Sequence, residues 1–420
     1  MKVLCIVNNV MPKLAEKTGL TGSSSGSWLI DISEKISKEK DVSLAIATVG
    51  GNKFKKIEID NITYYLLPGN GKNLLFYTKK YEKIWKNINE DFKPDVVHLY
   101  GTEYAHGLSF LRANLEVKAV VSVQGIISKI KDVLFDGLPK RFDLKYSTIK
   151  ERIKLNGLYP RYLLYKKNSK LEKEILSRVN YASVVNKWDY SAVKAINPAL
   201  KFFPIEYNLR ESFYASKKWN IESANNYQIF TAPGSDSVKG LHILLKAIHL
   251  VKRNYKEIKV VVPGFQTVNG KMLVNTGYKK YIYKLIKELD LEDNIVFKNR
   301  LTEQEMARNM LSSRIVVVPS QIEGTSLVLR ESMYLGLPCI ASFRGGMADF
   351  VEDRINGLLY DFNEYEYLAQ LIEELFSNDE LAKSISKNAI DKAEKAHERN
   401  KNVKATLDMY REIYGGNKDE

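Results

Sequence analysis

Short apolar runs alternate with helical patterns along the whole chain. The first half opens with an apolar run, a Gly/Ser-rich stretch and a helical pattern with a basic end: KVLCIVNNV, GLTGSSSGS and WLIDISEKISKEK. Further apolar runs follow at intervals: VSLAIATV, ITYYLL, DVVHLY, AVVSVQG and YASVVN. Runs of this length predict buried strands, and strands that alternate with helices predict a parallel, doubly wound sheet.

The second half repeats this arrangement. A predicted strand enters a Gly/Ser loop in YQIFTAPGSDSVKG, and the amphipathic pattern LHILLKAIHLVKRNY follows. Five more short strands are predicted at IKVVVPG, IVFKN, RIVVVPS, PCIAS and GLLYD. An irregular segment near residues 205–225 separates the halves, and a polar helical tail begins near residue 379. We therefore predict two α/β domains, residues 1–210 and 211–394, with closing helices at about 395–420 that return to the first domain.

The composition is that of an ordinary globular protein with a basic surplus. The 420 residues are 45% hydrophobic and 27% charged, and two domains are expected at this length. Lysine and arginine number 64 against 50 aspartate and glutamate residues, which gives a formal charge of +14. That excess suits nucleic acid, an anionic membrane surface or a phosphorylated substrate, and it does not choose among them.

Cysteine content and hydropathy favour a cytoplasmic protein. Cys5 and Cys339 lie in apolar runs, so we expect two reduced core residues without a disulfide. The cysteines and histidines show no zinc-ligand spacing. No apolar stretch approaches the roughly 20 residues that span a bilayer, and the first apolar run is too short for a signal peptide.

One region is both basic and aromatic. Residues 129–178 hold fourteen basic and six acidic residues, interleaved with LYPRYLLYKK. A solvated helix face explains such a run as well as a binding surface does. The hypothesis it raises is a peripheral contact with an anionic membrane surface or with a diphosphate-linked lipid.

Candidate chemistry concentrates where the predicted strand RIVVVPS ends. Glu323 lies in the turn after this strand, and Glu331 lies about two turns into the helix that follows. Thr325 and Ser326 are suitable N-cap residues for that helix. Open α/β sheets bind ligands at the carboxyl ends of their strands, and the free N–H groups of residues 324–327 suit a phosphate.

The segment around these glutamates is PSQIEGTSLVLRESMYLGLPCIASFRGGMADFVEDRINGLL. It resembles the C-terminal signature of GT-B glycosyltransferases of the retaining family 4 type, the glycosyl transferases of group 1. Their pattern is two glutamates with seven residues between them, a Gly-x-Pro helix end, a strand, and a Gly-Gly pair before a helix. Matching positions are occupied by Gly336, Pro338, Gly345, Gly346 and Gly357. The resemblance implies an α/β GT-B fold, in which two Rossmann-like doubly wound domains face each other across a cleft.

This resemblance implies roles for the residues of the segment. Glu331 would bind the ribose of the nucleotide, and Glu323 would face hydroxyls of the donor sugar near the reacting carbon. Backbone amides would bind the diphosphate at Gly324, Thr325, Ser326 and Leu327. A structural alternative for Glu331 is an exposed helix carboxylate paired with Arg330 or with a lysine.

The loop TAPGSDSVKG matches the family less closely. The family has an arginine after the glycine of this turn and a Lys-Gly pair further on, and the two cations neutralise the leaving diphosphate. Lys239 and Gly240 match the pair, whereas Ser235 stands at the arginine position. Arg300 is the candidate for the missing cation. The family needs no Asp-x-Asp metal motif, so neither a metal nor another cofactor is expected.

In the first half, polar residues follow a predicted strand. His106 resembles the family histidine that contacts the donor sugar, and Glu103 and Gln124 lie at neighbouring strand ends. His98 falls inside the strand DVVHLY and fits better as a hydrogen-bonded core residue.

The Gly-rich stretch TGSSSGS resembles the family's loop near the donor phosphates and the acceptor. Gly22 and Ser23 are its candidate donor contacts. The same composition is equally typical of a flexible linker.

The sequence thus predicts a retaining, metal-independent glycosyltransferase of the hexosyltransferase type. It would move a sugar from a nucleotide-diphosphate donor, UDP by preference, to a hydroxyl of a growing glycan or lipid-linked acceptor. Cell-surface polysaccharide synthesis at the cytoplasmic face of a membrane is the expected setting. The candidate catalytic residues are His106, Lys239 and Glu323.

Two alternatives stay open. A UDP-sugar 2-epimerase shares the GT-B architecture but needs more acid and base residues than we can assign to the cleft. A non-catalytic sugar-nucleotide or nucleic-acid binding protein fits the missing arginine and the net charge. The sequence contains no recognisable nucleic-acid module, so nucleic acid is not an expected partner.

Overall fold

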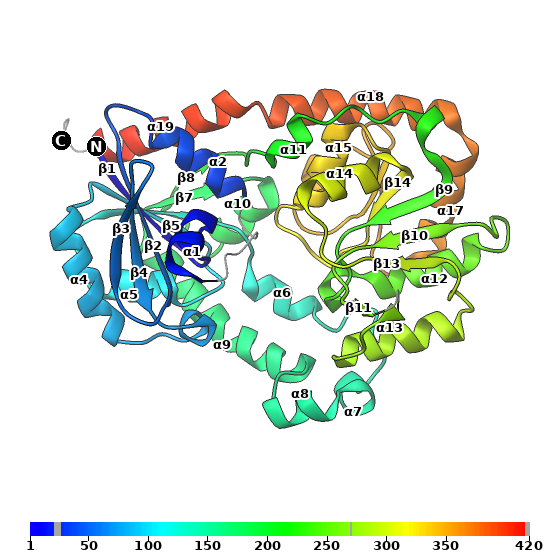
Figure 1. The fold of residues 1–420 in the computed structure, drawn as a ribbon, viewed down its shortest axis with the longest axis horizontal. Coiled ribbons are helices and arrows are strands. Elements are labelled where there is room, and N and C mark those ends of the chain that lie inside the picture. Colours follow the sequence, from blue (N-terminus) through cyan, green and yellow to red (C-terminus); the bar gives the residue numbers. More distant parts are fainter. Residues whose placement is uncertain (21–26, 269–270, 416–420) are drawn as a thin grey trace. The chain divides into compact units, whose positions relative to one another are not determined.

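The chain folds into two compact units, shown as a ribbon in Figure 1. The computed structural model describes residues 1–20, 27–268 and 271–415. The first unit comprises Met1–Ser128, Tyr165–Asn208 and His397–Glu420, and the second comprises Lys129–Leu164 and Leu209–Ala396. The predicted candidates Gly22 and Ser23 lie outside the described residues.

The first unit is built on an eight-stranded sheet with the order β3-β4-β2-β1-β5-β6-β7-β8. Its strands are β1 (Lys2–Val7), β2 (Ser43–Gly51), β3 (Lys55–Ile59), β4 (Ile62–Pro68), β5 (Val96–Tyr100), β6 (Lys118–Ser122), β7 (Tyr181–Val184) and β8 (Lys201–Pro204). Its helices are α1 (Pro12–Thr18), α2 (Ser27–Ile36), α3 (Gly71–Leu75), α4 (Lys80–Phe92), α5 (His106–Arg112), α10 (Lys187–Lys194) and α19 (Arg399–Gly415). Neighbouring strands are parallel except β3 and β4.

The second unit is built on a six-stranded parallel sheet with the order β13-β10-β9-β14-β15-β16. Its strands are β9 (Asn225–Thr231), β10 (Lys259–Val262), β13 (Ile295–Phe297), β14 (Ser313–Val318), β15 (Cys339–Ser342) and β16 (Leu358–Tyr360), and β11 (Thr267–Val268) pairs separately with β12 (Lys271–Met272). Its helices are α7 (Phe142–Tyr146), α8 (Ile149–Lys154), α11 (Glu211–Tyr214), α12 (Leu241–Val251), α13 (Gly277–Glu288), α14 (Glu303–Leu311), α15 (Leu327–Leu335), α16 (Met347–Phe350), α17 (Tyr365–Ser377) and α18 (Asp379–Ala396). Two helices, α6 (Ile127–Val133) and α9 (Leu158–Ser177), carry the chain from one unit to the other.

Two edge strands of the first sheet, β3 and β8, were absent from the sequence prediction. In β3 the residues KKIEI alternate between half-buried and exposed, and in β8 the residues KFFP are half-buried or exposed. Both lie at an edge of the sheet. Such strands need no continuous apolar run, which is the signal that identified the buried strands.

Residues 129–164 belong to the second unit, whereas the predicted boundary assigned them to the first domain. The cause is aromatic packing on α13. The rings of Phe142 and Tyr146, on α7, lie 5.6 Å and 5.0 Å from the ring of Tyr281. These contacts bury the inner face of α7, and burial of aromatic area is a large stabilising term.

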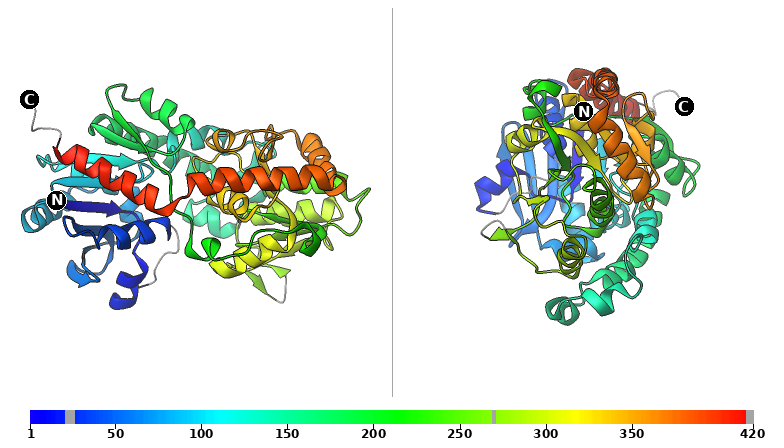
Figure 2. Two further views of the ribbon diagram at one scale, coloured as in Figure 1. Left: turned by 90° about the horizontal axis from the view of Figure 1, so that it is seen from above. Right: turned by 90° about the vertical axis from the view of Figure 1, so that its right-hand side faces the viewer.

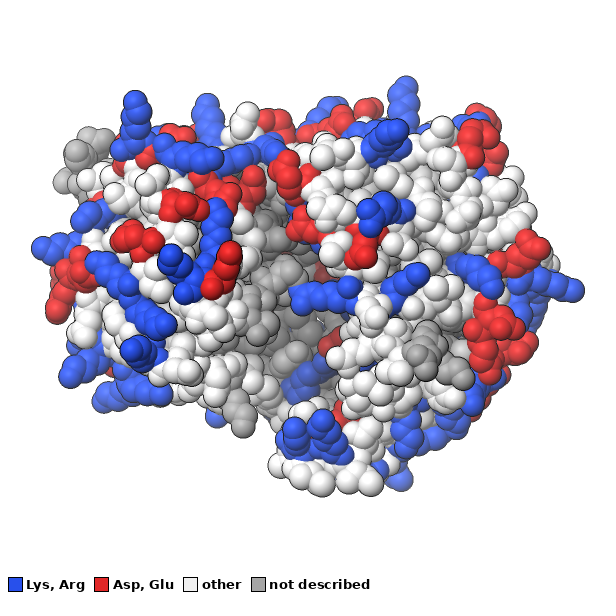
Figure 3. Space-filling model, in the orientation of Figure 1, with Lys and Arg blue, Asp and Glu red and all other residues white. Residues whose placement is uncertain are grey.

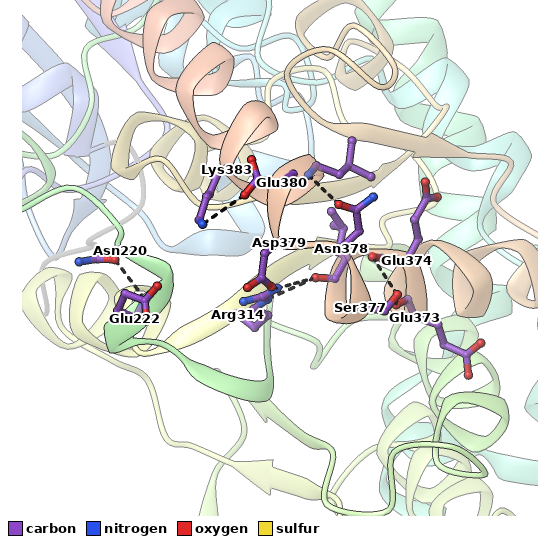
Figure 4. A network of polar contacts seen from close by, with 12 residues as sticks. Asn220, Glu222, Arg314, Glu373, Glu374, Ser377, Asn378, Asp379, Glu380 and Lys383 are labelled. Atoms are coloured by element: carbon purple, nitrogen blue, oxygen red, sulfur yellow. Dashed lines mark hydrogen bonds and ion pairs between the residues drawn. The ribbon is translucent and has the colours of Figure 1, made fainter.

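A buried arginine joins the long C-terminal helices of the second unit to its sheet. Arg314, on β14, donates from Nε and Nη2 to the carbonyl oxygen of Leu375, at 3.2 and 3.1 Å. Its Nη2 also pairs with Asp379 at 2.5 Å, as Figure 4 shows. The guanidinium therefore ties the end of α17 and the start of α18, the long orange-red helix in the left view of Figure 2, to the central strand.

Both cysteines are buried free thiols, as predicted. Burial raises the pKa of Cys5 to about 12 and raises that of Cys339 further. Neither thiol is therefore a nucleophile at neutral pH. Among the described residues, no helix has the length and hydropathy needed to cross a membrane.

The buried histidines make the fold sensitive to acid. His98 bonds through Nδ1 to the Tyr410 hydroxyl and through Nε2 to the Ser122 hydroxyl, each at 2.7 Å, which confirms it as a core residue. Burial lowers the pKa of His98 to about 3, and it lowers the pKa values of His106 and His242 to about 4 and about 3.

We expect the free energy of unfolding to fall as the pH drops from about 6.5 to about 4. The unfolded chain takes up protons on these histidines near pH 6.5, while the folded chain does not until about pH 4 or below. Each histidine contributes up to about 1.4 kcal/mol per pH unit. Urea unfolding at several pH values measures the slope of the free energy of unfolding against pH. His98→Gln should reduce this slope by the contribution of one proton. A flat profile between pH 6.5 and 5 would contradict the assignment.

Candidate functional site

The strand order of the second sheet reverses between β9 and β14. Doubly wound sheets bind ligands at such a reversal, beyond the carboxyl ends of the strands. Lys239 follows β9, and Glu323 follows β14. Lys239 Nζ pairs with Glu323 Oε1 at 2.5 Å, and the Ser320 hydroxyl donates to the same oxygen at 2.9 Å. The two predicted catalytic residues of this domain are therefore in contact at the strand reversal.

Two glycines permit the loops that carry these residues to approach each other. Gly240 has φ +70°, and a Cβ there would lie 1.6 Å from the carbonyl oxygen of Pro319. Gly345 has φ +64°, and a Cβ there would lie 2.2 Å from the carbonyl oxygen of Glu323. Only glycine fits such positions without moving the backbone. This close packing explains the glycine of the Lys-Gly pair and the first glycine of the Gly-Gly pair.

The Glu323 carboxylate favours the charged form of Lys239. Burial acts to lower the pKa of this ammonium, but the Glu323 carboxylate outweighs burial, so the pKa lies above its usual value. The Lys239 side chain keeps 35% of its surface exposed, against 15% for Glu323. An ammonium that is charged at neutral pH and partly accessible can bind an anionic ligand.

Helix α15 begins as the sequence predicted. Ser326 is its N-cap, and the Ser326 hydroxyl accepts a hydrogen bond from the amide of Leu329 at 3.5 Å. The residues just before and at the helix start, Gly324 to Leu327, precede the intrahelical hydrogen bonds of α15. Their amides lie at the positive end of the helix dipole, where a phosphate is favoured.

Glu331, on α15, is fully buried and paired with Arg210. Arg210 Nε and Nη2 donate to Glu331 Oε1 and Oε2, each at 2.6 Å. Burial raises the pKa of Glu331, and the two hydrogen bonds from Arg210 oppose that shift. The structural alternative of an exposed helix carboxylate is wrong, because the Glu331 side chain has no exposed surface.

A second arginine that the sequence analysis missed contacts the loop before Lys239. Arg161 Nη1 and Nη2 donate to the two carboxylate oxygens of Asp236, at 2.6 and 3.0 Å, and Nη2 also donates to Ser237 Oγ at 3.1 Å. Burial acts to raise the pKa of Asp236, but Arg161 more than cancels this, and the pKa is lowered. Asp236 also caps the short helix that ends at Lys239.

Arg161 thus brings a guanidinium to the loop in which Ser235 replaces the family's arginine. Arg300, the candidate from the sequence, is exposed in the loop after β13. No signal near Ser235 could have identified Arg161, because it lies 75 residues from Asp236 in sequence and outside the predicted donor domain.

A cavity of about 170 Å³ adjoins this loop and is lined on one side by residues of α8 and α9 and on the other by the start of α13. Cavities that enclose a drug-sized ligand measure roughly 300–1,000 Å³. This cavity is therefore too small for a nucleotide sugar, and we do not assign the donor to it.

The first unit carries its own polar group at the carboxyl end of β5. His106, the first residue of α5, bonds through Nε2 to the carbonyl oxygen of Tyr100 at 3.1 Å. A carbonyl only accepts, so Nε2 carries the proton and Nδ1 is an acceptor; Nδ1 has no partner among the described residues. The pKa of about 4 keeps the ring neutral, so His106 can accept a hydrogen bond from a hydroxyl.

Glu103 lies on the same loop. Its Oε2 is buried without a hydrogen-bond partner in the described part of the chain. Burial raises the pKa of Glu103 to about 7. Such a carboxyl can hold or release a proton near neutral pH.

The family match lies in the second unit. Residues 215–392 match the family described as glycosyl transferases group 1. All predicted donor-site residues of the second unit fall in this range: Lys239, Arg300, Glu323, Gly324, Thr325, Ser326, Leu327 and Glu331.

One curated relative extends the comparison to most of the chain. An uncharacterized glycosyltransferase of Methanocaldococcus jannaschii is 24% identical over 372 residues, 86% of this chain and 88% of that protein. The match with two further curated glycosyltransferases covers only 52% and 43% of their lengths.

The solved structures show the same fold. Sucrose-phosphate synthase from Thermosynechococcus elongatus superposes with a TM-score of 0.74 at 14% identity, covering 99% of this chain and 100% of that one. HepE of Anabaena, solved in complex with UDP and glucose, superposes with a TM-score of 0.67 at 14% identity, covering 97% and 99%. The chain thus has the GT-B fold, and its residues 215–392 match the glycosyl transferases of group 1.

Proposed function

We propose that this chain is a retaining, metal-independent glycosyltransferase that uses a nucleoside-diphosphate sugar, with UDP as the nucleotide. The observation that carries the proposal is the contact of Lys239 with Glu323 at the reversal of strand order, beside the amides that begin α15. A cation, a set of N–H donors and a carboxylate are the groups that a diphosphate and a sugar hydroxyl require. HepE, solved with UDP and glucose, has the same fold and supports a UDP-sugar donor.

In the proposed reaction, the bond between the anomeric carbon and the diphosphate oxygen breaks, and the electron pair leaves with the diphosphate. The acceptor oxygen bonds to the anomeric carbon on the same face, which retains the configuration. The acceptor proton passes to the departing phosphate oxygen. Lys239 and the amides of Gly324–Leu327 stabilise the charge that develops on the diphosphate.

The remaining residues bind and orient the substrates. Glu323 accepts a hydrogen bond from a sugar hydroxyl, and Glu331 accepts from the ribose while Arg210 holds it in place. His106 accepts from a donor-sugar hydroxyl through Nδ1. We propose no direct role for Arg300, because Arg161 brings the guanidinium to the loop before Lys239. The acceptor is a hydroxyl of a growing glycan or of a lipid-linked glycan, as in polysaccharide synthesis.

Nucleotide binding tests the donor site directly. We expect UDP at a hundred times its Kd to stabilise the folded chain by about 2.7 kcal/mol. The melting temperature should therefore rise, and by the same amount with and without magnesium. GDP, ADP and CMP are the comparison ligands. The shift should disappear in Glu331→Ala and persist in Glu380→Ala, which changes an exposed glutamate of α18. No shift with any of the four nucleotides would overturn the proposal.

One observation favours the 2-epimerase as the second candidate. Glu103, with a pKa of about 7, supplies an acid or base that the sequence alone did not reveal. Incubation of the protein with UDP-sugar in the absence of an acceptor separates the two functions. An isomerised or hydrolysed sugar nucleotide would favour the epimerase, and an unchanged donor favours the transferase.

A further inference from the structure

Helices α7 and α8 present an apolar surface that the described chain leaves uncovered. We name residues 140–155 the α7–α8 tip. The four most exposed large apolar side chains of the described residues all lie in it: Leu144 at 72%, Ile149 and Ile153 at 78%, and Leu155 at 74%. Ile149 and Ile153 are four residues apart on α8 and therefore share one face.

The charge that surrounds this apolar surface is positive. The tip contains six basic residues, all exposed: Lys140, Arg141, Lys145, Lys150, Arg152 and Lys154. In the described part of the chain none of the six forms an ion pair with a carboxylate. Figure 3 shows basic and uncharged atoms side by side at the bottom of the view, where α7 and α8 lie in Figure 1.

The two carboxylates of the tip are engaged inside the protein. Asp143 accepts hydrogen bonds from the amides of Leu158 and Tyr159, at the start of α9. Glu151 accepts from the amide of Thr148 at 2.9 Å and from the amide of Gly277 at 2.7 Å. Neither carboxylate therefore neutralises the basic residues that face outward.

The tip is also held firmly in place. Phe142 and Tyr146 pack on Tyr281, and the bond of Glu151 to Gly277 fixes α8 to the start of α13. Arg152 Nη2 donates to the carbonyl oxygen of Leu144 at 2.8 Å, which joins α8 to α7. The exposed aliphatic side chains are thus presented by an ordered element, and no internal rearrangement is needed to expose them.

We propose that the α7–α8 tip binds the interface of an anionic lipid bilayer. Aliphatic side chains enter the boundary between headgroups and acyl chains, while lysine and arginine contact anionic headgroups. The surface offers branched aliphatic residues and no exposed tryptophan, unlike the aromatic centres of protein interfaces, and no aromatic platform for bases. Bilayer binding through the tip is peripheral.

This surface is smaller than the basic region 129–178 of the sequence. The second part of that region, from Tyr165, belongs to the first unit. There Glu174 pairs with Arg112 and Arg178, and Glu172 accepts from the amides of Ile127 and Ser128. The proposed contact is the tip, residues 140–155, where exposed aliphatic and basic side chains occur together.

Vesicle co-sedimentation of the full chain tests this proposal without any nucleotide, so its result is independent of the proposed transfer reaction. The vesicles are phosphatidylcholine alone and phosphatidylcholine with 30% phosphatidylglycerol by design, at low and high salt. We expect binding to the anionic vesicles that weakens with salt. I149S/I153S/L155S should lower the partition coefficient more than about 10-fold, and K145Q/K150Q/K154Q should lower it roughly 100-fold at about 5-fold for each lysine.

Two control variants carry matched changes on other exposed positions of the second unit. V268S/L273S/Y283S removes three exposed apolar side chains, and K383Q/K387Q/K395Q removes three exposed lysines of α18. Both should bind vesicles like the unchanged chain, and all four variants should keep its melting temperature. Equal binding of tip and control variants, or no preference for anionic vesicles, would overturn the proposal. So would self-association in sedimentation velocity that depends on the tip without vesicle binding, since the surface would then join two copies.

Discussion

Replacement of Lys239 by methionine is expected to lower kcat for sugar transfer about 100- to 1,000-fold. This is the usual loss of rate when one preorganised group that stabilises a developing negative charge is removed. Methionine keeps the side chain as far as Cε and removes the charged ammonium group with its hydrogen-bond donors. The Lys239 pKa lies above its usual value because of Glu323, so the substitution removes a positive charge at neutral pH. If the charge acts mainly on the leaving diphosphate, kcat falls more than KM rises.

Steady-state kinetics with UDP-sugar and a hydroxyl acceptor measure this effect. Lys246→Met is the matched control, because Lys246 is a half-buried lysine of α12 in the same unit. We expect it to keep kcat within about threefold, as surface changes away from a site usually do. A transfer rate in Lys239→Met that equals the control would exclude Lys239 from the reaction.

The pairing of Lys239 with Glu323 at 2.5 Å demands a second comparison. Removal of the lysine alone leaves the carboxylate without its cation, and this disturbance could itself slow the reaction. Lys239→Met in a Glu323→Gln background separates the loss of the cation from the effect of the unpaired carboxylate. If the Lys239 cation acts on the diphosphate, its loss still lowers kcat at least about 100-fold in this background. If the loss of Lys239 no longer lowers kcat there, the effect of the single change came from the unpaired carboxylate.

The candidate site around β14 could be predicted because its signals are local. Within residues 313–336 lie the buried strand, the turn with Glu323, the Ser326 cap and the glycine that ends α15. Each follows from short-range preferences: apolar runs for strands, hydroxyl side chains for N-caps and glycine for a left-handed helix end. The same locality explains why the strands of the two large sheets were predicted, with the exception of the edge strands β3 and β8.

The ion pairs that shape the site could not be predicted, because their partners are distant in sequence. Arg210 is 121 residues from Glu331, and Arg161 is 75 residues from Asp236. One sequence offers no way to pair such residues. The assignment of residues 129–164 to the second unit could not be predicted for a related reason. Their packing on α13 depends on aromatic contacts of Phe142 and Tyr146 with Tyr281, which is more than a hundred residues away in sequence.

Replacement of Glu331 by alanine is expected to lower the free energy of unfolding by about 3–5 kcal/mol, the cost of removing one partner of a buried ion pair. The Glu331 side chain is completely buried, and Arg210 retains 18% of its side-chain surface. Alanine would leave the guanidinium without its two 2.6 Å acceptors. Urea unfolding measures the loss.

Glu374 provides a matched control for this change. It forms a two-point pair with Arg354 in the same unit, at 2.9 and 3.1 Å, but Arg354 is 50% exposed. An exposed pair contributes about 0–1 kcal/mol, so Glu374→Ala should change the free energy of unfolding by no more than that. An equal loss in Glu331→Ala and Glu374→Ala would show that the buried pair is not special.

The double change Arg210→Met with Glu331→Leu separates the structural role of Glu331 from its proposed role in binding. Buried ion pairs replaced by apolar residues of similar volume are often neutral or more stable, so the double variant should recover most of the stability that Glu331→Ala loses. If Glu331 binds the ribose, this stable variant still shows no melting-temperature shift with UDP. A double variant that regains the UDP shift would mean that Glu331 only supports the fold, and the ribose would then be held by other groups.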